Sequence, residues 1–379
     1  MKETAFTTAG SSQSVGQPGW WKSLIGRIIS YIIFVAWTLI TVLPLFWMFY
    51  SSFKSNDELT RKIFAMPHDL LDNKNDEYVV IPPQLNVIPD YDTEKDTRER
   101  LIIESATISP GRRLLVHFLV KEDLPPEVAS LKSGDTLTVS QLPFPMRVKI
   151  SWRTIWFNYR SSFTRGGLAL KFLNSVLYAG VSTFFIIMFS LMIGFALSKM
   201  PFRKLSVFIM GLIGLGYLIS NNSVIIPLFL MLSATNLTDT HLGIILVYTA
   251  FGIPLAVMLI TQFMRGLPDS VVESATMDGA STLRVLVSII APMSAPVIIT
   301  VSIISALGIW NEFLLVLVLA SSEFTKSLPV GVYSFSSLTS TQLGWQLAAL
   351  VMATLPAMLI YFSFQRRLAE GVVGGAIKE

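Results

Sequence analysis

Long apolar runs recur along this chain, separated by shorter polar stretches. A bilayer core about 30 Å thick needs about 20 apolar residues in a helix. Six segments reach or approach that length: Ile28–Tyr50, Ser175–Leu197, Leu205–Leu218, Gly243–Phe263, Pro296–Ala320 and Leu343–Phe364. The third is the shortest, and the run Val224–Leu232 after it is too short to cross, so we expect it to be interfacial or re-entrant. The pattern therefore predicts an all-α polytopic membrane protein.

Basic residues in the short connections predict the orientation of the spans. Lys and Arg favour the cytoplasmic side, and they cluster before the first span, between the second and third, between the fourth and fifth, and after the sixth. The two short connections on the other side hold only Lys326. We therefore expect both termini, and the connection at 265–292, to be cytoplasmic.

Charge is concentrated between the first two spans, where residues 54–165 hold 16 of the 29 basic and 16 of the 25 acidic residues. This stretch must lie in water, and its balanced charge argues against a nucleic-acid partner. Tyr78–Ile81, Leu101–Ile108, Arg113–Val120, Thr136–Val139 and Arg147–Trp152 are strand candidates, the last two because apolar and polar residues alternate. The sequence thus predicts an inserted extracytoplasmic β-rich domain at about 69–150.

The chain has no cysteine, which excludes disulfides and thiolate chemistry. Its three histidines (His68, His117, His241) lack the spacing of metal ligands. There is no phosphate-binding G-x-x-x-x-G-K-[ST] loop, no G-x-S-x-G and no H-E-x-x-H. We expect a non-catalytic chain that binds no cofactor or metal, so any ATP and Mg would be used by a separate subunit.

The connection after the fourth span predicts two short helices joined by a tight turn. Pro268 and Asp269 suit the first turn of a helix, and Gly279 suits the left-handed residue that ends one. Ser281 can cap a second helix, expected over Thr282–Ile290 and stopping at Ala291-Pro292. The small residues at this corner would let another protein's backbone approach closely, but a connecting loop commonly contains such caps, so spacing alone leaves both interpretations open.

The stretch E-S-A-T-M-D-G-A-S (273–281), followed by Ile290-Ala291-Pro292, resembles the EAA motif of the membrane subunits of binding-protein-dependent ABC importers. Ser274 and Ala291 depart from the motif's usual alanine and leucine. Other stretches resemble the maltose-type carbohydrate branch of that family: Ser51–Lys54, Phe172–Ser175, Gly308–Phe313, Ser327–Gly331 and Phe364–Lys378. The inserted domain is the main departure, because this subunit class usually has a short loop there.

The resemblance implies a six-span type I ABC importer permease fold and a place in a bacterial or archaeal inner membrane. It implies four kinds of partner: a second permease subunit, two cytoplasmic ATPase subunits, an extracytoplasmic solute-binding protein and a sugar or oligosaccharide substrate. It also implies that the EAA loop couples the chain to an ATPase through Glu273, Ser274, Ala275, Met277, Asp278, Gly279 and Ala280. Glu273 would pair with a basic residue there and Asp278 would hold the turn, although both could be ordinary solvated charges.

Trp310, Asn311 and Glu312 lie within the fifth apolar run. A carboxylate facing lipid at the midplane costs at least about 2.5 kcal/mol, so Glu312 should face the bundle interior or water. A ring beside hydrogen-bonding groups suits a sugar path, but an interfacial tryptophan beside a polar helix contact fits equally well.

The expected organisation is a cytoplasmic tail (1–27), a first span (28–51), an extracytoplasmic loop with the insertion (52–171), a permease core (172–364) with its coupling loop (265–292), and a second cytoplasmic tail (365–379). Three alternatives stay open. They are a permease of the same family for a non-sugar solute such as glycerol phosphate, an ion-driven secondary transporter, and a membrane sensor.

Overall fold

The computed structural model describes residues 20–54, 56–67, 77–81, 116–120, 132, 135–201, 203–335 and 343–373. The chain divides into two units, Met1–Met48 and Phe49–Glu379. The first unit contains most of helix α1 (Trp20–Ser51), which has a proline, Pro44, inside it. The remaining elements belong to the second unit.

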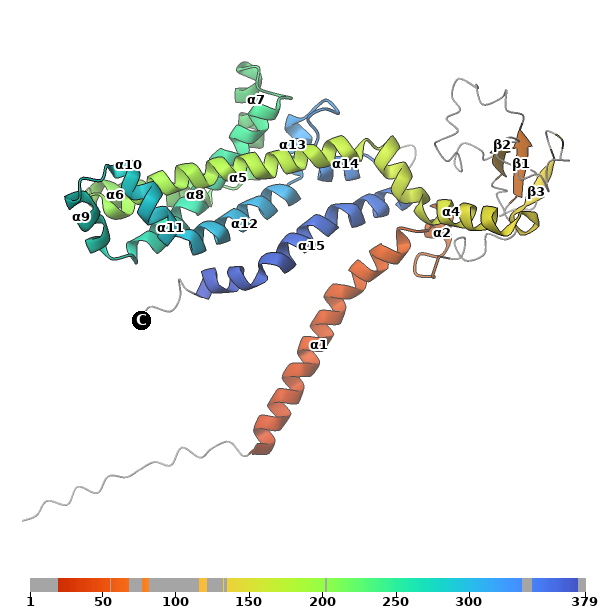
Figure 1. Cartoon of the computed structure of the whole chain (residues 1–379), viewed down its shortest axis with the longest axis horizontal. Coiled ribbons are helices and arrows are strands. Elements are labelled where there is room, and N and C mark those ends of the chain that lie inside the picture. Colours follow the sequence, from red (N-terminus) through yellow and green to blue (C-terminus); the bar gives the residue numbers. More distant parts are fainter. Residues whose placement is uncertain are drawn as a thin grey trace, which may run out of the picture. The chain divides into compact units, whose positions relative to one another are not determined.

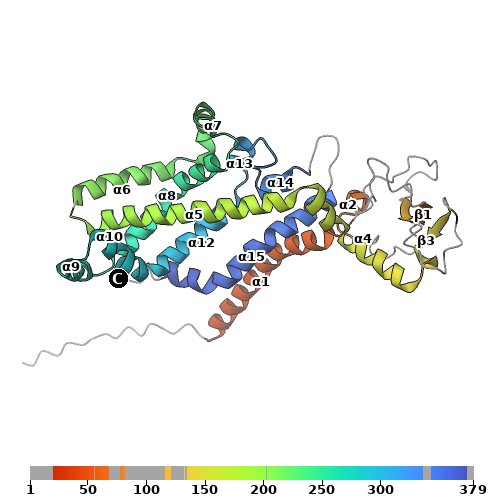
Figure 2. The ribbon, with the colours of Figure 1, turned by 45° about the horizontal axis from the view of Figure 1, so that its top comes forward.

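The second unit is mainly helical (Figures 1 and 2). Its described elements are α2 (Asn56–Arg61), β1 (Glu77–Ile81), β2 (Val116–Val120), β3 (Thr136–Thr138), η5 (Val139–Gln141), α4 (Phe144–Arg165), α5 (Leu168–Lys199), α6 (Arg203–Leu218), η6 (Asn221–Val224), α7 (Ile225–Ala234), α8 (His241–Arg265), α9 (Asp269–Met277), α10 (Thr282–Val285), the π-helical turn η7 (Leu286–Ile290), α11 (Ala291–Met293), α12 (Ala295–Asn311), α13 (Leu314–Leu319), α14 (Leu328–Tyr333) and α15 (Leu343–Val373).

The centre of the second unit is the packing of α5 against α8, with α12 beside them. Ile186, Ile260 and Val301 are among its fully or almost fully buried side chains. Glycines let α5 and α8 approach closely: a Cβ at Gly252 would stand 2.2 Å from the Ile186 side chain, and one at Gly194 would stand 2.9 Å from Ile260. Small residues at helix contacts are typical of membrane bundles, where close van der Waals packing replaces the hydrophobic effect.

Four described helices are long and apolar enough to cross a membrane: Gly26–Ser51, Leu168–Lys199, His241–Arg265 and Leu343–Gln365. Two bent pairs raise the number to six if each pair is one span: Arg203–Leu218 with Asn221–Ala234, bent by 82°, and Thr282–Met293 with Ala295–Asn311, bent by 80°. Five of the six expected spans fall on one of these helices or pairs, and the fifth, Pro296–Ala320, overlaps the second pair only as far as Asn311. The expected short segment after the third span is η6 with α7.

The prediction of one continuous fifth span over Pro296–Ala320 is wrong. Helix α12 ends at Asn311, and Glu312 has an extended backbone (φ −72°, ψ 132°) before α13 begins at Leu314. The apolar composition of a run predicts its length, but it gives no sign of a break within it. Here a side chain of the run itself, Glu312, accepts a hydrogen bond from a backbone N–H group that the break leaves without a helical partner.

In the insertion, three short strands form one sheet in the order β2-β1-β3, with β1 parallel to β2 and antiparallel to β3. They match three of the five strand candidates; Leu101–Ile108 lies outside the described residues. Arg147–Trp152 is not a strand but part of α4, and two of its apolar residues, Val148 and Trp152, fit a four-residue spacing that continues through Trp156. A β-rich domain over 69–150 stays a prediction, since most of that range is not described.

The second helix of the 265–292 connection also differs from expectation. It does not stop at Ala291-Pro292: α10 passes into the π-helical turn η7 and then into α11, and the chain bends only at Ser294. Proline inside a helical run removes one backbone hydrogen bond and favours a local distortion. Pro292 is such a proline, since it lies in α11, just after the π-helical turn η7.

Candidate functional site

The connection between α8 and α12 forms an elbow, which we define as residues 266–281. Helix α9 begins directly after Pro268 and ends in a left-handed turn at Gly279, whose φ is +80°. The turn is closed by backbone bonds: Gly279 N donates to Thr276 O at 3.0 Å and Ala280 N donates to Ala275 O at 3.0 Å. This is the Schellman pattern of a helix that ends in glycine, and it confirms the predicted position of the turn.

The start of the second helix is capped as the sequence predicts. The Ser281 hydroxyl accepts a hydrogen bond from Arg284 N at 3.4 Å, and Ser281 has the extended backbone of an N-cap residue. The Asp278 carboxylate is not needed to close the turn, since the described bonds there are all made by backbone groups and the side chain is exposed.

The elbow has a buried inner side and a bare outer side. Ala275 is 8% exposed and packs with Val285 in the core cluster of α5, α8 and α12. Met277 is 88% exposed, and Leu283, just after the elbow in α10, is 64% exposed. Glu273, Ser274, Asp278 and Gly279 are exposed as well, and Ala280 is half-buried. Of the seven residues predicted to couple to an ATPase, Ala275 is buried and anchors the elbow, and the others form a surface that a partner could contact.

A buried lysine fixes the elbow to the end of α5. The Lys199 ammonium group donates to Leu267 O at 2.6 Å and to the Asp269 carboxylate at 2.6 Å, and the Lys199 side chain is only 2% exposed. From the sequence alone, Lys199 is only one of the basic residues that predict the orientation of the spans. Its contact could not be foreseen, because the partners are about 70 positions away.

Trp310, Asn311 and Glu312 do not converge on one site. Trp310 is 6% exposed, its Nε1 donates to Ala353 O in α15 at 3.1 Å, and its ring forms a T-shaped pair with Phe172 at 5.5 Å between the ring centroids. Asn311 is exposed, and its side-chain amide donates to Leu307 O of its own helix at 2.9 Å. Of the three, only Glu312 bonds to the side chain of another helix.

Glu312 holds the break in the fifth span. Its Oε1 accepts a hydrogen bond from Leu315 N at 2.8 Å, which caps the start of α13, and its Oε2 accepts one from the Tyr248 hydroxyl of α8 at 2.8 Å. A side-chain acceptor is what a helix start needs where water is scarce. The observed geometry fits the predicted interior-facing carboxylate and gives it a structural partner.

We expect Glu312→Ala to lower the thermal stability of the purified chain, because Leu315 N and the Tyr248 hydroxyl both lose their acceptor, at a cost of about 1–3 kcal/mol for a buried group left unpaired. Glu312→Gln should retain most stability, since its amide can still accept from one group and donate to the other. Equal loss of uptake in both variants with unchanged stability would instead assign Glu312 to the transport path through its charge.

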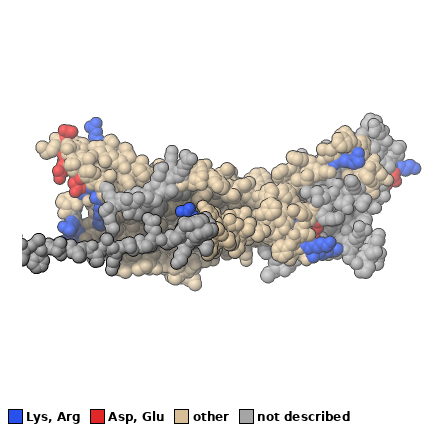
Figure 3. Space-filling model, turned by 90° about the horizontal axis from the view of Figure 1, so that it is seen from below, with Lys and Arg blue, Asp and Glu red and all other residues tan. Residues whose placement is uncertain are grey.

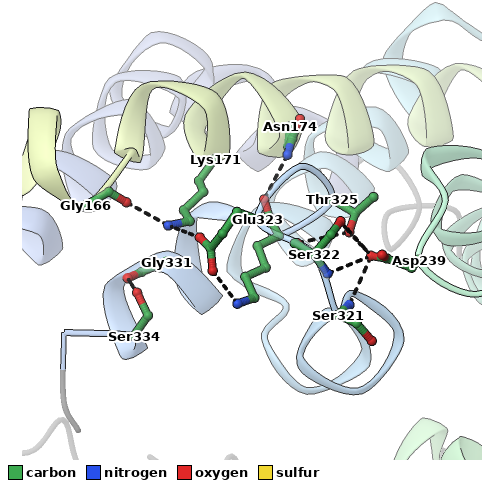
Figure 4. Close-up of polar contacts among 11 residues, drawn as sticks. Gly166, Lys171, Asn174, Asp239, Ser321, Ser322, Glu323, Thr325, Gly331 and Ser334 are labelled. Atoms are coloured by element: carbon green, nitrogen blue, oxygen red, sulfur yellow. Dashed lines mark hydrogen bonds and ion pairs between the residues drawn. The ribbon is translucent and has the colours of Figure 1, made fainter.

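At the other end of α5, a carboxylate organises the loop between α13 and α14. Asp239 has a left-handed backbone (φ 57°) and accepts hydrogen bonds at 3.0 Å from Ser321 N, Ser322 N and the Ser322 hydroxyl, and a further one from the Thr325 hydroxyl (Figure 4). Burial alone would raise the pKa of Asp239, but the hydrogen bonds from Thr325, Ser322 and Ser321 together lower it below its usual value.

The same loop is tied directly to α5. The Lys171 ammonium group, in a side chain 5% exposed, contacts the Glu323 carboxylate at 2.8 Å and donates to Gly166 O at 2.7 Å. Lys326 contacts Glu323 at 2.5 Å, and the Asn174 amide donates to Lys326 O at 3.0 Å (Figure 4). The same amide also donates to Phe324 O at 2.6 Å. Hydrogen bonding to Lys171 and then Lys326 lowers the pKa of Glu323. The sequence pointed to none of these pairs.

On the face seen in Figure 3, Lys, Arg, Asp and Glu side chains gather toward the two ends, and the surface between them carries few charged side chains. Among the described residues, no group of three or more His, Asp or Glu side chains could hold a metal ion. The described part of the chain thus offers a transmembrane bundle with an exposed elbow at one end and a tightly bonded loop at the other.

Residues 163–374, more than half of the chain, match the family described as binding-protein-dependent transport system inner membrane component. The chain belongs to this family. The permease is therefore a multi-pass inner-membrane component of an ABC importer, a class of non-catalytic subunits that work with ATPase and binding-protein partners. ATP and Mg are used by the ATPase partners.

Several curated relatives of the permease have similar sequences. It is 32% identical over 252 residues to the diacetylchitobiose uptake system permease protein NgcG of Streptomyces coelicolor, covering 65% of this chain and 82% of the relative. It is also 32% identical over 252 residues to the probable starch degradation products transport system permease protein AmyC of Thermoanaerobacterium thermosulfurigenes, covering 66% and 89%.

The fold of the permease is similar to that of a chain in the crystal structure of a bacterial ABC transporter involved in the import of the acidic polysaccharide alginate. The TM-score is 0.58 with 17% identity, over 91% of this chain and 97% of the other. The predicted ABC importer permease fold is thereby confirmed.

Proposed function

We propose that this permease translocates a sugar or oligosaccharide that an extracytoplasmic binding protein delivers. The complex would contain a second permease subunit and two cytoplasmic ATPase subunits. The names of its relatives support a carbohydrate substrate, since they include uptake systems for diacetylchitobiose, starch degradation products and trehalose. These relatives match at about 30% identity, which supports the substrate class and not one particular sugar.

The elbow is the proposed ATPase contact. The observation that carries this proposal is its two-sided burial: Ala275 and Lys199 fix it to the transmembrane core, while Met277 and Gly279 stand on a bare surface. A partner that pushes on such a rigid elbow moves α8 and α12 with it. Glu273 supplies an exposed carboxylate that can pair with a basic residue of the ATPase. In this proposal the elbow and both termini lie in the cytoplasm, which agrees with the basic residues of the short connections.

Purification of the tagged permease from its own membranes tests the proposal. The complex should contain an ATPase subunit and a second permease, and in proteoliposomes the binding protein loaded with the right sugar should stimulate ATP hydrolysis and uptake. A panel of oligosaccharides, monosaccharides and glycerol phosphate identifies the substrate class. A complex without an ATPase, or one stimulated only by the non-sugar solute, would contradict the corresponding part of the proposal.

A further inference from the structure

Helix α4 has an exposed apolar face. Four side chains follow one another at four-residue intervals, so they lie along one side of the helix. Their exposed fractions are 71%, 51%, 63% and 41% for Phe144, Val148, Trp152 and Trp156, which we call the aromatic stripe. The packed side of α4 is formed by Phe157, Asn158, Ser161 and Ser162, all of them buried. An apolar surface of this kind is expected to have a binding partner.

The stripe begins where the transmembrane part of the chain ends. Trp156 lies 5.8 Å from Trp152 and 6.3 Å from Phe53, and Phe53 lies 5.5 Å from Phe49 in the last turns of α1. An aromatic ladder therefore runs without a gap from the end of the first candidate span onto α4. Trp and Tyr are enriched at membrane–water interfaces, where an apolar ring with a polar edge suits the headgroup region.

Polar contacts hold the second half of α4 against the residues that follow the first candidate span. The Asn158 amide donates to Ser52 O at 2.7 Å and to Lys54 O at 2.8 Å, just after the first candidate span. A Cβ at Gly344, at the start of the last span, would stand 2.9 Å from the same amide. At its C-terminal end, α4 passes through Gly166 and Gly167 directly into α5 (Figure 2). The helix therefore leaves the bundle at the membrane surface, on the side opposite the elbow.

The charge of α4 indicates what lies against the stripe. Its 22 residues include five basic residues and no acidic one. Arg147 and Arg160 are exposed, and the Arg147 guanidinium lies 5.9 Å from the centre of the Phe144 ring. A helix with Trp and Phe on one face and Lys and Arg beside it is typical of segments that rest on a bilayer, with rings among the acyl chains and cations at the phosphates.

We propose that α4 is a membrane-surface anchor whose aromatic stripe lies in the headgroup region and whose basic residues bind anionic phospholipid. Charge complementarity and continuity with the aromatic residues at the end of α1 favour a lipid surface over a protein. The anchor would hold the inserted segment close to the bilayer, beside the outer end of the helical bundle. This role concerns lipid contact and is independent of the substrate.

The absence of cysteine from the chain allows a site-specific test. Val148→Cys places a nitroxide label on the stripe with all its aromatic rings intact, and Lys132→Cys places one at an exposed position before β3. The intact complex is reconstituted in nanodiscs that contain phosphatidylglycerol, and accessibility to oxygen and to a water-soluble nickel reagent is measured. The oxygen-to-nickel ratio at position 148 should exceed that at 132 severalfold.

Two comparisons assign the effect to anionic lipid. Nanodiscs of phosphatidylcholine alone should lower the ratio at 148 and leave 132 unchanged, and Arg147→Glu combined with Arg160→Glu should do the same in phosphatidylglycerol. Equal ratios at 148 and 132 in the anionic nanodiscs would overturn the proposal. So would protection of position 148 that appears only when the binding protein is added, which would assign the stripe to that protein.

Discussion

Replacing Gly279 with valine is expected to abolish ATP-driven uptake while the permease remains in the membrane. Gly279 has φ +80°, a conformation in which a β-branched residue is strained by about 1–3 kcal/mol. A Cβ added there would meet no atom of the chain itself within 4 Å. The loss of uptake would therefore have two causes: a distorted elbow, and a new side chain on the face proposed to touch the ATPase. The measurements are uptake and substrate-stimulated ATP hydrolysis in proteoliposomes.

Two variants separate these causes. Gly266→Ala changes a glycine of the same elbow that has a helical φ of −77°, so uptake should be retained. Gly279→Asn keeps a residue type that tolerates the left-handed conformation but adds a side chain, so the turn should survive and uptake should still fall. Normal coupling in both Gly279 variants would contradict the proposed contact at this turn.

The elbow was predictable because its signals are local. Proline before α9, glycine at the left-handed turn and serine before α10 each report a helix boundary within a few residues, and all three positions agree with the structure. Its attachment was not predictable, since the Lys199 contact to Leu267 and Asp269 joins distant parts of the chain. A single sequence carries no signal for such a pair.

The same distinction explains the incorrect predictions of a strand over Arg147–Trp152 and of a continuous fifth span. Alternation over Arg147–Trp152 was too short to separate period two from a four-residue spacing, and the wider stretch to Trp156 resolves it as a helix. The fifth apolar run predicts a continuous span, because composition and length carry no signal for a break at Glu312. The Glu312 carboxylate that caps α13 also accepts a hydrogen bond from the Tyr248 hydroxyl, which belongs to another helix and is not foreseeable from a single sequence.

We expect Asp239→Ala to lower the stability of the permease more than any change within the loop between α13 and α14, which Asp239 holds. The carboxylate accepts from two backbone N–H groups and two hydroxyls of the loop, and bonds to a charged acceptor contribute about 1.5–3 kcal/mol each when shielded from water. Partial exposure reduces this sum, so we expect a loss of about 2–4 kcal/mol. Thermal unfolding of the detergent-solubilised complex should show an apparent melting temperature lower by several degrees.

Asp239→Asn is the matched control. Asparagine also tolerates the positive φ of 57° and keeps one oxygen acceptor, so its stability should lie between those of the wild type and the alanine variant. Equal stability of all three proteins would show that water replaces the carboxylate at no cost, and that Asp239 does not organise the loop.

The difference in melting temperature between the wild type and Asp239→Asn should depend on pH, and this dependence tests whether the negative charge of Asp239 stabilises the protein. Hydrogen bonds lower the pKa of Asp239 below its usual value near 3.8 in the folded protein, so the folded state favours the carboxylate. Its contribution to stability is therefore fully present above that usual value and is lost as the pH falls through the lowered pKa. The difference in melting temperature should stay constant from about pH 8 to pH 5 and shrink below about pH 4. A difference that grows on acidification would mean that Asp239 is held protonated, which the three donors at 3.0 Å argue against.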